Sequence, residues 1–325
     1  MPRRRCSLII LLLLAAAFAA LNFLAYRHAR AMLNYSSGGV RTEKPEEMSP
    51  SSKLRVLLLG VNMPRPVDER PPAALSPEAR ALTIAVPGGI TLSAWHADGG
   101  VAAPLVIFFH GYTTEKIRLL REAQKIHAMG ASVLLVDFRG SGGSSESHTT
   151  LGYREAEDVA AAVRFAREHL PRSAVILYGQ SMGAAAILRA IHVLDVRPDA
   201  VILESVFDTM LGAIRNRFRA MGVPSFPNAE LMVFWGGWQF GFNGFAHNPV
   251  EYARSLDCPV LFLHGADDFR ATLAQARRVY DAAGGPKRFV EFADIGHASY
   301  AARHPYQWQA VVRAFLAPFL RPPLR

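Results

Sequence analysis

The pattern of hydrophobic and polar positions separates an apolar N-terminal segment from a long region of alternating character. An uncharged stretch of 21 residues runs from Cys6 to Tyr26. A helix needs about 20 apolar residues to cross the hydrocarbon core of a bilayer. We therefore predict a membrane helix within residues 1–30, retained as a signal anchor. Ala17-Phe18-Ala19 also resembles a signal-peptide cleavage site, so removal of this segment is the alternative.

Charges on the two flanks of this segment bear on its orientation. Arg3, Arg4 and Arg5 precede it and favour a cytoplasmic N-terminus, whereas Arg27 and Arg30 follow it and weaken that bias. We expect a single-pass protein of the inner (plasma) membrane, with the rest of the chain on the outer, periplasmic side.

Residues 31–79 have the composition of a tether. Ser36 to Gly39 is typical of a flexible linker, and four prolines between positions 64 and 72 favour a stiff, extended chain. The apolar patch Val56 to Leu59 interrupts this composition. It fits either a short element packed on the main domain or one that lies at the membrane surface.

Residues 80–321 alternate short apolar runs with amphipathic segments. Leu105 to Phe109 is continuously apolar, as in a strand covered on both faces, and Glu155 to His169 has helical spacing. This alternation predicts a mostly parallel, doubly wound α/β sheet, with the active site beyond the carboxyl ends of its strands. The predicted strands are 82–86, 90–95, 105–109, 132–136, 174–178, 201–203, 260–263 and 289–292, and the predicted helices are 115–129, 155–169, 184–193, 271–283 and 305–320.

A Gly-x-Ser-x-Gly pentapeptide, Gly179 to Gly183, lies between a predicted strand and a predicted helix. In this context the pattern is that of a nucleophile elbow, which presents its serine on a sharp turn. Gly179 and Gly183 let the strand and the helix approach closely. We predict Ser181 as the nucleophile; the alternative is a turn with a buried serine.

A serine nucleophile needs a base, and the base needs an acid that orients it. His297 follows the last predicted strand and is the candidate base. Asp267 and Asp268 both follow the strand 260–263, and either could be the acid, or could instead cap the next helix. Glu204, at the end of the preceding strand, is an outside candidate.

An oxyanion hole requires two backbone N–H groups that point at the developing negative charge. The N–H of Met182, directly after the serine, is the first candidate. The second is the N–H of Tyr112, in the loop His110-Gly111-Tyr112 that follows an early strand. This loop could also be a simple glycine turn.

Four motifs occur in the order found in one enzyme family: His110-Gly111, Asp137 to Ser144, Gly179 to Gly183, and His264 to Asp268 followed by Gly296-His297. With them, residues 80 to 320 resemble bacterial α/β-hydrolases of the serine aminopeptidase-like group, close to membrane-anchored monoacylglycerol-lipase-like enzymes. The resemblance implies an α/β-hydrolase fold and favours Asp268 over Asp267 as the acid. It also implies that Asp137 belongs to a structural turn. The segment Phe269-Arg270-Ala271-Thr272 departs from the family pattern, in which a hydrophobic residue and a proline often follow the acid.

Residues 206–256 separate two predicted strands and are expected to form a helical cap. Such a cap sets specificity in this fold, and its aromatic residues fit either an acyl or otherwise apolar substrate, or the cap's own core. Arg215, Arg217 and Arg219 fit a solvated helix face or contacts to an anionic headgroup. The aromatic residues are Phe207, Phe218, Phe226, Phe234, Trp235, Trp238, Phe240, Phe242 and Phe245.

Composition narrows the function classes further. The net charge of +9 comes from scattered arginines without interleaved aromatic residues, which argues against nucleic acid and favours anionic lipid headgroups. The two cysteines, Cys6 and Cys258, offer neither a disulfide framework nor a zinc motif. We predict a serine hydrolase of lipid or acyl esters that requires no metal and no organic cofactor. The alternatives are a peptidase of the same fold and a non-catalytic, membrane-tethered binding module.

Overall fold

The structure is a computed structural model that describes residues 2–45, 47–67, 69–100, 102–170 and 174–320. The predicted domain end at residue 321 lies outside the described residues, as do the side chains of Arg3, Arg4 and Arg5. The chain forms two compact units. The helical unit comprises Met1–Pro64 and Met210–Ala246, and the sheet unit comprises Arg65–Thr209 and His247–Arg325.

The sheet unit is built on eight strands in the order β1-β2-β4-β3-β5-β6-β7-β8. The pairs β1–β2 and β2–β4 are antiparallel, and all other neighbours are parallel. This confirms the predicted mostly parallel sheet. The strands are β1 (Arg80–Val86), β2 (Ile90–Ala97), β3 (Leu105–Phe109), β4 (Ser132–Val136), β5 (Val175–Gln180), β6 (Ala200–Glu204), β7 (Val260–Gly265) and β8 (Lys287–Phe292).

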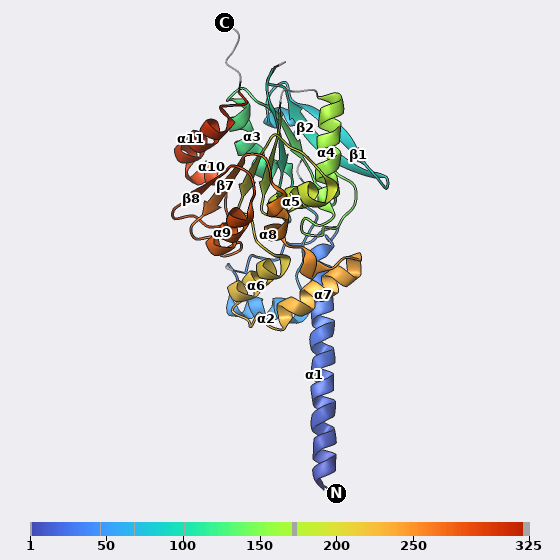
Figure 1. The fold of residues 1–325 in the computed structure, drawn as a ribbon. Coiled ribbons are helices and arrows are strands. Elements are labelled where there is room, and N and C mark those ends of the chain that lie inside the picture. Colours follow the sequence, from blue (N-terminus) through green and yellow to red (C-terminus); the bar gives the residue numbers. More distant parts are fainter. Residues whose placement is uncertain (1, 46, 68, 101, 171–173, 321–325) are drawn as a thin grey trace. The chain divides into compact units, whose positions relative to one another are not determined.

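Helices cover both faces of this sheet (Figure 1). Successive side chains of a strand point to opposite faces. Thus Leu177 of β5 packs in one core, and Ile176 and Tyr178 pack in the other. The first core includes α4 (Glu155–His169), α5 (Met182–Leu194), α8 (Pro249–Tyr252) and α9 (Leu273–Ala282); the second includes α3 (Leu120–His127), α10 (Tyr300–Arg303) and α11 (Pro305–Leu316). The short 3₁₀ helices are Pro72–Ala74, Lys116–Leu119, Gly244–Ala246 and Ala253–Ser255.

The helices of the sheet unit depart from the predicted bounds at a few of their ends. Helix α9 begins at Leu273 rather than at 271, because Thr272 and Gln275 form a reciprocal capping box. The predicted helix 115–129 starts as a 3₁₀ turn, and the helix predicted over 305–320 ends at Leu316. The prediction over 155–169 is confirmed in α4.

The helical unit contains α1 (Pro2–Leu33), α2 (Pro50–Leu59), α6 (Met210–Met221) and α7 (Asn228–Phe240). The stretch Ser7–Leu33 of α1 is long and apolar enough to cross a membrane. Helix α2 includes the apolar patch Val56 to Leu59 that interrupts the tether composition, and it begins earlier, at Pro50. It forms because Ser49 accepts a hydrogen bond from the N–H of Ser52 and because Pro50 occupies the first helical position.

Helix α7 packs against the second half of α1. Gly236 makes this approach possible, since a Cβ at this position would lie 3.1 Å from Leu33 Cδ1. Beside it, the Trp235 ring meets Tyr26 edge-on, and its Nε1–H donates to Asn22 Oδ1 at 3.2 Å. Much of the segment predicted as a cap is therefore grouped with the N-terminal helices, a partnership that the sequence pattern did not indicate.

Candidate active site

Strand register gathers the predicted site loops at one edge of the sheet. Phe109 at the end of β3 is paired with Gly179 of β5, and Glu204 at the end of β6 is opposite Gln180 and Leu263. In the same way, Gly265 at the end of β7 is paired with Phe292 of β8. The loops that carry Tyr112, Ser181, Asp268 and His297 therefore all leave the sheet at the carboxyl ends of its parallel strands, as predicted.

Ser181 occupies a strained turn between β5 and α5. Its φ of 52° and ψ of −109° are sparsely populated for a residue with a side chain. The backbone holds this conformation partly through the Ser181 N–H, which donates to the carbonyl of Glu204 at 2.8 Å. Gly183 is required by packing, because a Cβ there would lie 2.2 Å from the carbonyl oxygen of Phe109. The strand, the strained serine and the helix have the geometry of a nucleophile elbow.

His297, which is half-buried, forms a hydrogen-bonded pair with the buried Asp268. His297 Nδ1 lies 2.7 Å from Asp268 Oδ2. The other carboxylate oxygen accepts from the backbone N–H groups of Arg270 and Ala271 at 2.9 and 3.0 Å. Burial raises the pKa of Asp268, but the neighbouring His297 and these hydrogen bonds outweigh it and hold the pKa below its usual range.

The two other candidate acids have different partners. Asp267 contributes a backbone N–H that donates to the carbonyl of Ile295 at 3.1 Å. Glu204 is fully buried and accepts from the Tyr178 hydroxyl and from Gln180 Nε2. The hydrogen bond to His297 therefore distinguishes the three candidate acids, because the carboxylate that makes it is that of Asp268.

Glu204 is half of a buried acidic pair that the sequence did not reveal. Burial and the nearby charge of Glu122 together raise its pKa to about 8. Glu122 is also fully buried, and it accepts a hydrogen bond from the Ser299 hydroxyl. A charged residue on an amphipathic helix ordinarily faces solvent, so the burial of Glu122 could not be predicted from the sequence.

The loop of Tyr112 lies beside the elbow. A Cβ on Gly111 would lie 3.7 Å from Ser181 Cβ, which places the following residue near the nucleophile. His110 anchors the loop: Nε2 accepts from the N–H of Phe138 at 3.0 Å, so Nδ1 carries the hydrogen that reaches the carbonyl of Gly111. Burial lowers the pKa of His110 and keeps this ring neutral.

Met182 supplies the other predicted oxyanion donor. It is the first residue of α5, and an N–H at this position has no acceptor within the helix. The positive end of the helix dipole lies at the same point. Both features favour a negative charge next to Ser181.

Comparisons with known proteins support the fold. A family model described as "Serine aminopeptidase, S33" matches residues 101–208. The solved esterase Pf2001 of Pyrococcus furiosus superposes with a TM-score of 0.68 at 23% identity, over 79% of this chain and 97% of that one. The chain belongs to the α/β-hydrolase superfamily.

Two curated relatives extend the comparison. YqkD of Bacillus subtilis is 25% identical over 243 residues, which cover 74% of this chain and 79% of its own length. The lysophosphatidylserine lipase ABHD12 of Rattus norvegicus is 23% identical over 246 residues, or 68% of this α/β-hydrolase and 58% of the rat protein.

Asp137 has the structural role that the resemblance implied. One carboxylate oxygen accepts from the backbone N–H of Lys116, and the other from Lys116 Nζ and from the N–H of Gly143. These contacts fix the turn after β4 of this α/β-hydrolase. Within the described residues, no three His, Cys, Asp or Glu side chains are grouped so that they could hold a metal ion.

Proposed function

We propose that this α/β-hydrolase cleaves carboxylic esters through an acyl-serine intermediate, with Ser181, His297 and Asp268 as its catalytic residues. The observation that carries the proposal is the Asp268–His297 pair, which leaves the same sheet edge as the strained serine of the elbow. The esterase and lipase names among the similar proteins support the hydrolase class.

The first half of the reaction forms the acyl-enzyme. Ser181 Oγ attacks the ester carbonyl carbon while His297 Nε2 takes the serine proton, and the π electrons of the carbonyl move to its oxygen. When the carbonyl re-forms, the bond to the alcohol oxygen breaks, and the alcohol leaves with the proton from His297. Asp268 holds the Nδ1–H of His297 and stabilises the imidazolium; its lowered pKa keeps it ionised.

The second half returns the free enzyme. A water molecule attacks the acyl carbon while His297 takes one of its protons, and the Ser181 oxygen then leaves with that proton as the carboxylic acid is released. The N–H groups of Tyr112 and Met182 stabilise the oxyanion in both halves. Each such donor lowers the barrier by about 3 kcal/mol.

Lipid or acyl esters are the proposed substrates, and α1 is the proposed single-pass signal anchor in the plasma membrane. The rat relative is a lysophosphatidylserine lipase. The apolar stretch of α1 supports an anchor, and we propose that the sheet unit lies on the outer, periplasmic side. Nucleic acid is not among the proposed partners.

Labelling with a fluorophosphonate probe tests the nucleophile directly. The wild-type protein should label, and Ser181→Ala should not. Equal labelling of the two proteins would contradict the assignment. A panel of p-nitrophenyl esters of increasing chain length beside aminoacyl amides then tests the substrate class: turnover of the amides alone would replace the esterase with a peptidase.

A further inference from the structure

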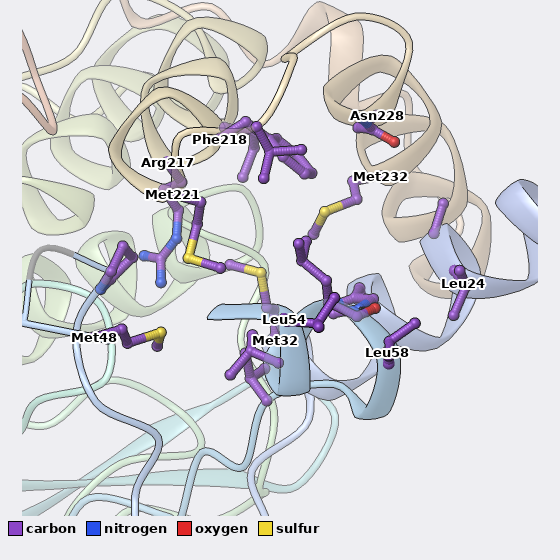
Figure 2. Close-up of a pocket in the computed structure, with 18 of the residues that line it drawn as sticks. Leu24, Met32, Met48, Leu54, Leu58, Arg217, Phe218, Met221, Asn228 and Met232 are labelled. Atoms are coloured by element: carbon purple, nitrogen blue, oxygen red, sulfur yellow. Dashed lines mark hydrogen bonds between the residues drawn. The ribbon is translucent and has the colours of Figure 1, made fainter. Parts of the chain in front are cut away.

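A cavity of about 330 Å³ lies entirely within the helical unit, between α1, α2, α6 and α7 (Figure 2). None of its lining residues belongs to the sheet unit, so it is distinct from the candidate active site. Figure 2 shows side chains from all four helices directed into this space. They include Met32 of α1, Leu54 and Leu58 of α2, Met221 of α6 and Met232 of α7.

The lining of the cavity is almost wholly hydrocarbon and thioether. Five methionines contribute to it, and their flexible side chains adapt to ligands of irregular shape. The polar lining residues are few, and one of them, His28, already hydrogen-bonds the carbonyl of Leu57 through Nε2 at 3.0 Å. Such a lining fits an apolar chain and offers little to a polar ligand. The methionines are Met32, Met48, Met63, Met221 and Met232.

The cavity wall is continuous with the apolar surface of the helix that we propose as the membrane anchor. Leu21 and Leu24 of α1 line the cavity, and the preceding turns of the same helix, Leu8 to Leu14, are exposed. On α2, the lining residues Leu54 and Leu58 are themselves 58% and 56% exposed. Exposed apolar surface of this extent is typical of contact with a lipid or protein partner. The adjoining membrane helix argues for lipid.

We propose that this cavity binds the hydrocarbon chain of a monoacyl lipid drawn from the membrane that holds α1. Its volume is near the lower end of ligand pockets, about 300–1,000 Å³, which favours one chain over two. The proposal goes beyond ester hydrolysis, because it concerns binding in the helical unit and does not depend on which residue is the nucleophile. The helical unit is then a lipid-binding module as well as an anchor.

Photocrosslinking in a catalytically disabled protein tests the proposal. Full-length Ser181→Ala protein in nanodiscs is irradiated with a lysophosphatidylcholine that carries a diazirine and an alkyne in its acyl chain. The expected adducts lie on the peptides of α6 and α7 that contain Met221 and Met232, and excess unlabelled lysophosphatidylcholine suppresses them. Because no turnover is needed, failure of this experiment is separate from failure of the proposed hydrolase activity. Adducts confined to the first turns of α1 and insensitive to competition would overturn the proposal.

Two leucines of α2 provide a matched pair of variants. Leu54 lines the cavity, whereas Leu59 does not, and the two are similarly exposed at 58% and 63%. Leu54→Trp should weaken labelling of the α6 and α7 peptides about tenfold, because the larger ring occupies the space of the chain. Leu59→Trp should leave it unchanged. Neither substitution overpacks a core, so both proteins should fold. Equal labelling in the two variants would show that the chain is bound elsewhere.

Discussion

The two units of the molecule handle polar and apolar groups in opposite ways. The sheet unit buries charged side chains and gives them defined partners, such as Lys116 with Asp137 and Arg139 with Asp158. The helical unit leaves large apolar side chains exposed, including Phe234 and Trp238 on one face of α7. Buried ion pairs with satisfied hydrogen bonds make a fold rigid, whereas extended exposed apolar surface is typical of a site of contact with a lipid or protein partner. The contrast supports the proposed division, with chemistry in the sheet unit and contact with lipid in the helical unit.

Removal of the nucleophile is the strongest test of this division. Ser181→Ala should lower kcat for p-nitrophenyl butyrate by about 10⁶-fold, as expected when the attacking oxygen is lost. The measurement is initial rate at saturating substrate with full-length protein in detergent. Crosslinking of the monoacyl probe in the helical unit should not change. A Ser181→Ala protein that retains turnover at a tenth of the wild-type rate or more would place the chemistry elsewhere.

The adjacent aspartates allow a second test within the sheet unit. Asp268→Asn keeps the shape of the side chain but removes the charge beside His297, and kcat should fall about 10⁴-fold because the imidazole is held in the wrong tautomer. Asp267→Asn is the control. Its side chain is one residue away, and kcat should stay within about twofold of wild type, as for a surface change. Similar losses in both variants would contradict the assignment of the acid.

The part of the site that could be predicted from sequence lies in short contiguous motifs. The elbow around Ser181 and the histidine after the last strand are local patterns, which can be recognised without knowledge of the fold. The choice between Asp267 and Asp268 could only be supported by family resemblance, because it depends on the direction of two neighbouring side chains. The structure supplies that direction through the hydrogen bond to His297.

The helical unit was harder to predict, since its packing joins segments far apart in sequence. Nothing in the composition of residues 50–59 indicated that they would share a cavity with α1 and α7. The contact of Trp235 with Asn22 spans 213 residues and has no local signature. The buried Glu122–Glu204 pair was missed for the same reason, because its two members lie far apart in the sequence, on α3 and β6.

That acidic pair predicts how the stability of the sheet unit depends on pH. Glu204 has a folded pKa of about 8 against an ordinary value of 4.5, so the folded state keeps a proton that the unfolded state loses. Stability therefore falls as pH rises from about 4.5 to about 8, and one pKa unit corresponds to about 1.4 kcal/mol. Glu204→Gln should flatten this slope. The measurement is chemical denaturation between pH 5 and pH 9.

The control for this experiment is a substitution at a solvent-exposed glutamate of the same protein. Glu168 is 59% exposed, so Glu168→Gln should reproduce the wild-type slope. If Glu204→Gln and the wild type lose stability in parallel as pH rises, the proton is not held by Glu204.

The smallest expected effect concerns the contact between α1 and α7. Asn22→Ala removes the acceptor for Trp235 Nε1–H, and hydrogen bonds between helices in membranes contribute about 0.6–1.7 kcal/mol. Asn34→Ala is the matched control. Asn22 and Asn34 both donate to the carbonyl four residues earlier, at 3.0 and 2.8 Å, but only the side chain of Asn22 bonds α7.

Limited proteolysis of the α6–α7 segment in detergent measures this effect. Cleavage should be several-fold faster in Asn22→Ala than in Asn34→Ala, since a loss of about 1.4 kcal/mol raises the open population tenfold. Turnover of p-nitrophenyl butyrate by the intact protein should be the same in both variants, because the proposed catalytic residues belong to the sheet unit. A loss of turnover in Asn22→Ala alone would mean that packing in the helical unit is coupled to catalysis. The proposed division of functions between the two units would then be wrong.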